Sequence, residues 1–150
     1  MKNVFDKKDK TELLSRIENL SASSKPKWGT MDVAKMLAHC NVTYEMVYDN
    51  KHAKPNAFKK FILKMFVKSI VVSEKPYKKN GQTATEFMIK DEKVFETEKK
   101  RLIDYINKTQ ELGENYFDGK ESHSFGVLSA VEWNNMFSKH LDHHLTQFGV

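Results

Sequence analysis

Apolar side chains recur every three to four residues along most of this chain, and residues that break helices are few. The sequence holds six glycines and three prolines among 150 residues, and they fall mainly between the apolar runs. Such spacing places apolar side chains on one face of a helix, and that face must pack against another element. With no internal repeat and no convincing set of strands, helix-on-helix packing is the predicted architecture, as a single domain over residues 1–150.

The pattern predicts five helical segments. Thr30 is the expected N-cap of the second segment, Gly113 the expected C-cap of the fourth, and Ser129 with Glu132 forms a capping box at the start of the fifth. The second segment is expected to stop near Asp49 and Asn50. The expected segments are Asp9–Leu20, Met31–Tyr48, Asn56–Val72, Asp91–Leu112 and Ser129–Phe148.

Two connections are long, and the third segment is ambiguous. Ser73–Lys90 is predicted to be a connection in which Thr83–Ile89 forms a short strand or extended piece, and Glu114–Leu128 is predicted to be a loop. In the third segment Lys60, Lys64 and Lys68 form one basic edge. A basic amphipathic helix can lie on a membrane surface, but the favoured interpretation is a bundle helix with a solvated lysine rim.

The composition of the chain indicates which kinds of molecule it can bind and where it is expected to act. The net charge is +5, but Arg16 and Arg101 are the only arginines and the lysines are interspersed with acidic residues, which argues against nucleic-acid binding. Cys40 is the only cysteine, so neither an internal disulfide nor a cysteine-based zinc site is expected. The N-terminal residues do not resemble a secretory signal, and no apolar run approaches the roughly 20 residues of a membrane span. A cytoplasmic protein without a membrane partner is therefore expected.

The apolar face of the last segment has two histidines at its centre. His140 and His144 are four residues apart, which places them one turn apart on the same side of a helix, where both rings can reach one ion. Burying each neutral imidazole without a partner costs about 1–3 kcal/mol, and a shared divalent metal would remove that cost. Their neighbours on this face are Trp133, Met136, Phe137, Leu141, Leu145 and Phe148.

His39, in the middle of the second segment, is the candidate third ligand. It faces partly apolar neighbours, but spacing alone does not pair it with the later histidines, and a hydrogen-bonded core histidine is the alternative. His143 is interpreted as a neighbour of the site or an exposed residue, His123 as a loop residue and His52 as a surface residue. Cys40 points away from His39 on the helical wheel and is interpreted as a small core residue.

Two stretches resemble a known family. The first runs from Trp28-Gly29-Thr30 to His39-Cys40, and the second from His123-Ser124-Phe125-Gly126 through Glu132-Trp133 to the string from His140 to Gly149. With these motifs the chain resembles the DinB/YfiT-like superfamily of metal-dependent enzymes across nearly its whole length. One departure is Ser124, where that pattern would have proline.

The resemblance implies a four-helix bundle with a long crossover connection and a metal, zinc or nickel, held by His39, His140 and His144. It also implies a small-molecule substrate, a hydrolase or a thiol-dependent S-transferase using a low-molecular-weight thiol, and a homodimer. Three histidine ligands leave a coordination position open, as catalytic zinc sites do. Two alternatives stay open. The first is a non-catalytic bundle that binds a metal or a ligand, for example in a stress response, and the second is a metal-free bundle. No catalytic residue is assigned, although Asp32 and Glu45 share the segment of His39.

Overall fold

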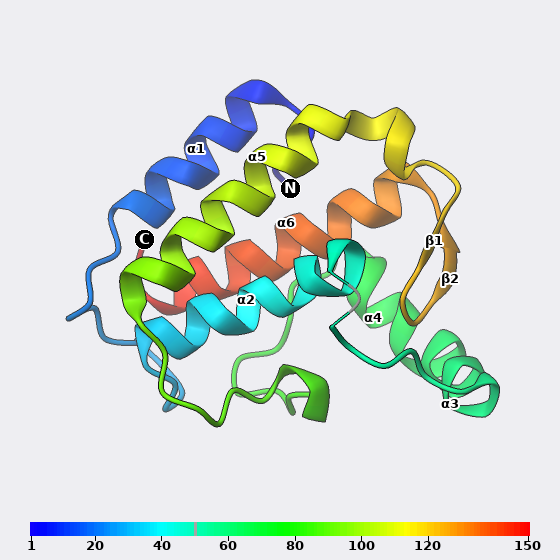
Figure 1. Cartoon of the computed structure of the whole chain (residues 1–150), viewed down its shortest axis with the longest axis horizontal. Helices are drawn as coiled ribbons and strands as arrows, with labels where there is room; N and C mark the ends of the chain where they lie inside the picture. The colour runs from blue at the N-terminus through cyan, green and yellow to red at the C-terminus, as the bar shows by residue number, and fades with distance from the viewer. Residues whose placement is uncertain (50) are drawn as a thin grey trace.

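The computed structural model describes residues 1–49 and 51–150 and is mostly helical (Figure 1). The helices α1 (Lys7–Glu18), α2 (Val33–Tyr48), α5 (Phe95–Phe117) and α6 (Ala130–Gln147) contact one another and enclose the apolar core. Nearly all of the largest completely buried side chains come from these four helices, among them Leu13, Met36, Tyr44, Leu102, Ile106, Phe117, Trp133, Phe137 and Leu141. The predicted all-α class is broadly confirmed, while the bundle with one long crossover and the single domain stay predictions.

Helix starts follow local capping chemistry. At α6 both hydrogen bonds of the predicted capping box between Ser129 and Glu132 are present. At α2 the cap is Asp32 rather than Thr30, because the Asp32 carboxylate accepts a hydrogen bond of 2.8 Å from the backbone N–H of Lys35. A carboxylate also interacts favourably with the positive end of the helix dipole. α2 ends at Tyr48, as predicted, and Asn50 lies outside the described residues.

Helix α5 continues beyond its predicted end. Gly113 does leave helical geometry, with φ of 70° and ψ of 175°, but the chain resumes a helical turn and reaches Phe117. That turn places the Phe117 ring in the core, where its centroid lies 5.3 Å from Trp133 and 5.6 Å from Phe137. Burial of this ring accounts for the extra turn, since an aromatic side chain contributes about 1.5–3 kcal/mol when removed from water.

The connections contain structure that was not predicted. The expected loop Glu114–Leu128 includes an antiparallel hairpin of β1 (Lys120–Ser122) and β2 (Gly126–Leu128). Strands of three residues are too short to show the alternation by which strands are recognised in a sequence. The extended piece expected at Thr83–Ile89 is instead a 3-10 turn, η2 (Thr85–Phe87).

The third segment forms an arm whose first part projects from the body of the molecule and whose last part contacts α6 (Figure 1). It consists of α3 (Ala57–Ile62), a π-helical stretch η1 (Leu63–Val67) and α4 (Lys68–Val72). The predicted bundle helix was wrong here, because Val72 is the only described side chain of these three elements that is fully buried. Among the residues that the structure describes, no helix combines the length and apolar character needed to cross a bilayer.

Candidate metal centre

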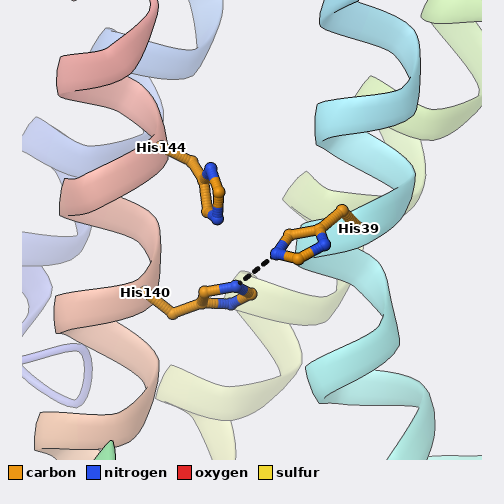
Figure 2. A group of neighbouring side chains, drawn as sticks. All are labelled: His39, His140 and His144. Carbon is orange, nitrogen blue, oxygen red and sulfur yellow. Dashed lines mark hydrogen bonds between the residues drawn. The ribbon is translucent and has the colours of Figure 1, made fainter. Parts of the chain in front are cut away.

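Three histidines meet between α2 and α6. His39 projects from the middle of α2, and His140 and His144 project toward it from successive turns of α6 (Figure 2). One ring nitrogen from each lies within 4.8 Å of the other two, and Nε2 of His39 is 2.9 Å from Nε2 of His140. The structure thus brings together the three residues selected from the sequence, although about a hundred residues separate His39 from the other two.

Hydrogen bonds to acceptors fix the orientation of two of the three rings. Nδ1 of His39 lies 2.9 Å from the carbonyl oxygen of Phe87, and a carbonyl can only accept, so this Nδ1 carries the proton. Nδ1 of His144 lies 2.8 Å from Oε1 of Gln147, whose amide nitrogen donates to the carbonyl of Trp28. The Gln147 amide is therefore oriented to accept from His144. In both histidines Nε2 is left with a lone pair directed at the other rings.

The ring of His140 has a hydrogen-bond partner that suits both the cation-free and the cation-bound state of the site. Nδ1 of His140 is 3.0 Å from Oγ1 of Thr43, and a hydroxyl can donate or accept. Without a cation, Thr43 donates to Nδ1, and Nε2–H of His140 donates to His39. That state leaves Nε2 of His144 with no hydrogen bond to any residue that the structure describes. With a cation, Thr43 accepts instead, and all three Nε2 lone pairs are available.

The electrostatics keep the three rings neutral. Burial lowers the pKa of His39, and it lowers the pKa of His144 to about 3. Burial and the neighbouring histidines hold the pKa of His140 well below its ordinary value. Metal ligands must be deprotonated imidazoles, so the site is ready to bind a cation at neutral pH.

The donor set fits a divalent cation such as zinc or nickel. Three imidazole nitrogens suit both metals. A tetrahedral zinc site with Zn–N distances of about 2.0–2.1 Å holds two ligand nitrogens about 3.3 Å apart. The observed separations, 2.9 Å for one pair and no more than 4.8 Å for any pair, bracket that spacing. Hydrogen bonds from the outer ring nitrogens to fixed acceptors are the usual support of such ligands.

Aromatic side chains surround the three histidines. The Phe87 ring centroid lies 5.4 Å from that of His39, and the Tyr77 centroid lies 6.5 Å from His140 and 5.7 Å from His143. The rings of Trp28 and His143 pack edge to face, with their centroids 5.9 Å apart. Burial raises the pKa of Tyr77 to about 12, so its phenol is neutral. Sequence reasoning missed these aromatic residues because they lie in connections without periodicity.

The other sequence candidates lie outside the triad. Asp32 caps α2, and Cys40 is a buried core residue whose thiol is 3.8 Å from the sulfur of Met36 and whose pKa burial raises. His123 lies 3.2 Å from the backbone oxygen of His52 and 2.9 Å from Ser124. His143 is half-buried and packs edge-on against His144 at 5.0 Å, so it is a neighbour of the triad rather than a member of it.

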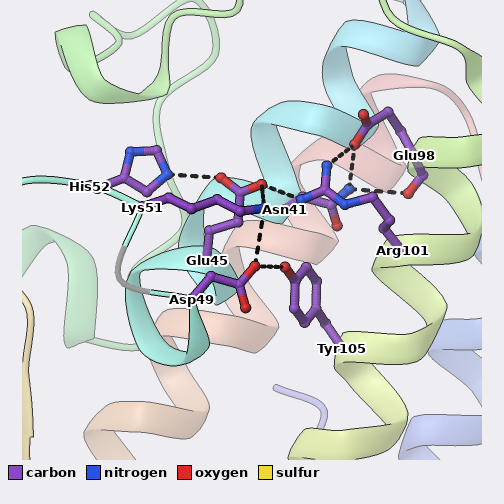
Figure 3. A network of polar contacts seen from close by, with 8 residues as sticks. All are labelled: Asn41, Glu45, Asp49, Lys51, His52, Glu98, Arg101 and Tyr105. Atoms are coloured by element: carbon purple, nitrogen blue, oxygen red, sulfur yellow. Dashed lines mark hydrogen bonds and ion pairs between the residues drawn. The ribbon is translucent and has the colours of Figure 1, made fainter.

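A polar network connects α2 to α5 (Figure 3). The carboxylate of Glu98 is buried and accepts hydrogen bonds from Asn41 at 2.8 Å and Arg101 at 2.7 Å. Arg101 also pairs with Glu45, which accepts from His52 at 2.8 Å. Glu45 is therefore engaged away from the triad, and its role is to attach the helix of His39 to α5.

Comparison with known families corrects the resemblance found in the sequence. The model of a family described as "Protein of unknown function (DUF1569)" matches residues 2–149. The chain belongs to this family. The DinB/YfiT-like assignment was wrong, because the match over nearly the whole chain is to DUF1569. The resemblance rested on two stretches, from Trp28 to Cys40 and from His123 to Gly149, and the three histidines they contain are what any three-histidine site between helices requires. No curated protein and no solved structure matches the chain.

Proposed function

We propose that this member of DUF1569 is a metal-dependent enzyme that acts on a small molecule at a cation held by His39, His140 and His144. The observation that supports it best is the matched hydrogen bonding of the triad. The outer nitrogen of each ring has an acceptor within 3.0 Å, and the inner nitrogens of His39 and His144 are left as lone pairs. Of the two protonation arrangements available to His140, only the cation-bound one gives every inner nitrogen a partner.

The residues around the triad define what the site would do. A divalent cation held by three neutral imidazoles acts as a Lewis acid at its remaining coordination position. Phe87 and Tyr77 would exclude bulk water from that side and contact apolar parts of a substrate, since both rings pack against the histidines. Neutral ligands leave the charge of the cation uncompensated, which favours substrates with a carbonyl or other polarisable oxygen.

Hydrolysis is the reaction class that the neighbouring residues favour. A hydrolase needs a proton acceptor beside the cation, and His143 is a titratable side chain outside the triad whose ring centroid lies 5.0 Å from that of His144. Burial lowers the pKa of His143, so its ring is neutral and able to accept a proton near pH 7. Transfer of a low-molecular-weight thiol is the second class, in which the cation would bind the thiol as a thiolate and the thiol proton would pass to solvent.

A substrate panel with three forms of the protein tests the proposal. Zinc-loaded, nickel-loaded and chelator-treated wild type would be assayed against esters, amides and electrophiles with a small thiol, next to His143→Gln and, as a control, His123→Gln. We expect metal-dependent turnover of a hydrolysable substrate that His143→Gln lowers by about 10²-fold or more and His123→Gln leaves unchanged. Turnover that is equal in loaded and chelated protein would refute the proposal. Turnover only with the thiol would favour the transferase.

A further inference from the structure

The arm formed by α3, η1 and α4 exposes its apolar side. Five large side chains on it are more than half exposed, and Ile62 is exposed to 37%. Soluble monomers rarely leave such side chains together on one surface unless it binds something. The five are Phe58, Phe61, Met65, Phe66 and Ile70. We call these six residues the apolar stripe.

Contacts with the body fix this orientation of the arm. Lys60 pairs with Glu121 of β1, and Lys68 pairs with Glu132 of α6 at 2.7 Å. The buried Lys139 donates to the backbone oxygen of Ile70 at 2.7 Å, at the end of α4. Lys60 and Lys68 therefore face the protein, whereas Lys64 of the same edge is exposed and the apolar stripe faces outward.

The π-helical stretch keeps the stripe continuous. A π turn contains more residues than an α turn, so the helix after it is rotated relative to an uninterrupted α-helix. Leu63–Val67 is such a turn, and Phe66 and Ile70 remain on the exposed side together with Phe58 and Phe61. The stripe extends along the whole arm, and none of its residues is charged.

Charge is distributed unevenly between the segment that contains the arm, residues 51–79, and the rest of the chain. Residues 51–79 contain nine lysines and one acidic residue, Glu74, a net charge of +8. The remaining residues contain sixteen Lys and Arg and nineteen Asp and Glu, a net charge of −3. Seven of the nine lysines are exposed. The exposed apolar stripe thus lies within a strongly basic segment of the chain.

We propose that the arm binds the surface of an anionic lipid bilayer. Phenylalanine, methionine and isoleucine on one side of a basic helix can enter the boundary between headgroups and acyl chains, while the lysines attract anionic headgroups at about 1 kcal/mol each. A second copy is the other occupant that an apolar helix suits. Twofold pairing of two arms, however, would bring together two helices that each carry four lysines and no acidic residue. Peripheral binding of this kind departs from the expectation of no membrane partner, which rested on the absence of a spanning segment.

Vesicle co-sedimentation tests the proposal with the full chain. Wild type would be mixed with vesicles of phosphatidylcholine alone or with added phosphatidylglycerol, at low and high salt. The stripe variant is Phe61→Ser/Phe66→Ser, and its control is Val94→Ser/Val131→Ser, two exposed valines outside the arm. The charge variant is Lys54→Gln/Lys64→Gln, and its control is Lys7→Gln/Lys8→Gln on α1. All substituted residues are exposed, and circular dichroism would verify folding.

We expect salt-sensitive binding to the anionic vesicles only, abolished by the stripe variant and weakened roughly tenfold or more by the charge variant, with both controls binding like wild type. No binding to anionic vesicles, or equal binding to both lipid compositions, would overturn the proposal. So would light scattering that shows a dimer which the stripe variant converts to a monomer, without vesicle binding. Metal content is independent of every outcome, because no substituted residue contacts the triad.

Discussion

Helix α6 and the arm have similar sequence patterns but opposite environments. In both, aromatic and aliphatic residues recur at helical spacing beside charged residues, yet the face of α6 with Trp133 and Phe137 is buried and the stripe with Phe61 and Phe66 is exposed. The difference is the neighbour, since the apolar face of α6 lies against other helices of the core, whereas the arm contacts the body through α4, Lys60 and Lys68 and leaves its apolar stripe uncovered. Periodicity identifies the apolar face of a helix, but the packing partner decides whether that face is core or binding surface.

The largest expected effect is on stability, when one phenylalanine ring is removed from α6 and, for comparison, one from the arm. Phe137→Ala removes a buried ring that stacks on Tyr44 and Trp133, and it should lower the free energy of unfolding by about 3–5 kcal/mol. Phe66→Ala removes an exposed ring and should change the free energy of unfolding by about 0.5 kcal/mol or less. Urea denaturation measures both. Similar losses for the two variants would show that the arm is packed against something in the isolated protein.

Metal should stabilise the region of α6 and leave the arm unaffected. A ligand that binds only the folded state at a hundred times its Kd raises stability by about 2.7 kcal/mol. Zinc added in that excess should raise Tm in wild type and in Phe61→Ser/Phe66→Ser alike, and should have no effect in His39→Ala. Differential scanning fluorimetry at pH 7 provides the comparison. An equal shift in His39→Ala would mean that zinc binds elsewhere.

Removing a hydrogen-bond acceptor of the triad should weaken zinc affinity more than removing an equivalent side chain elsewhere. Gln147→Leu removes the oxygen that accepts from Nδ1 of His144, so that the ring is no longer held in the required tautomer. Loss of such a partner commonly weakens metal affinity about 10–100-fold. Zinc competition with a chromophoric chelator would measure it, with Gln82→Leu in an exposed connection as the control. Unchanged affinity in Gln147→Leu would exclude an orienting role for this amide.

The smallest expected effect is the pH dependence of the stability that the network between α2 and α5 contributes. Burial alone raises the pKa of Glu45, but hydrogen bonds from His52 and Arg101 outweigh it, and the pKa is lowered in the folded protein. The stability it contributes is therefore present above the ordinary glutamate pKa of about 4.3 and is lost as the pH falls through the lowered value. Thermal melts from pH 6 to pH 3 should show a smaller decline in Glu45→Gln than in wild type. Parallel declines would mean that Glu45 has no such coupling.

The sequence predicted the helices better than it predicted what surrounds the site. The positions of α2 and α6 followed from apolar spacing and capping residues, and His140 and His144 were recognised because polar rings at the centre of an apolar face need a partner. His39 could only be proposed, since pairing residues a hundred positions apart depends on packing. Thr43 and Gln147 lie four and three residues from the histidines of their helices, so helical spacing indicates them once the ligands are known. Phe87 and Tyr77 lie in a connection without a pattern, and the exposure of the arm depends on neighbours that no local pattern contains.

Metal stoichiometry tests the central claim most directly. Untagged wild type, His140→Ala/His144→Ala and the control His123→Ala would be incubated with zinc or nickel, desalted and measured by plasma mass spectrometry. The account predicts close to one equivalent in wild type and in His123→Ala, and loss of the metal in the double variant. Absence of metal from all three proteins after incubation, or retention of a full equivalent by the double variant, would contradict it.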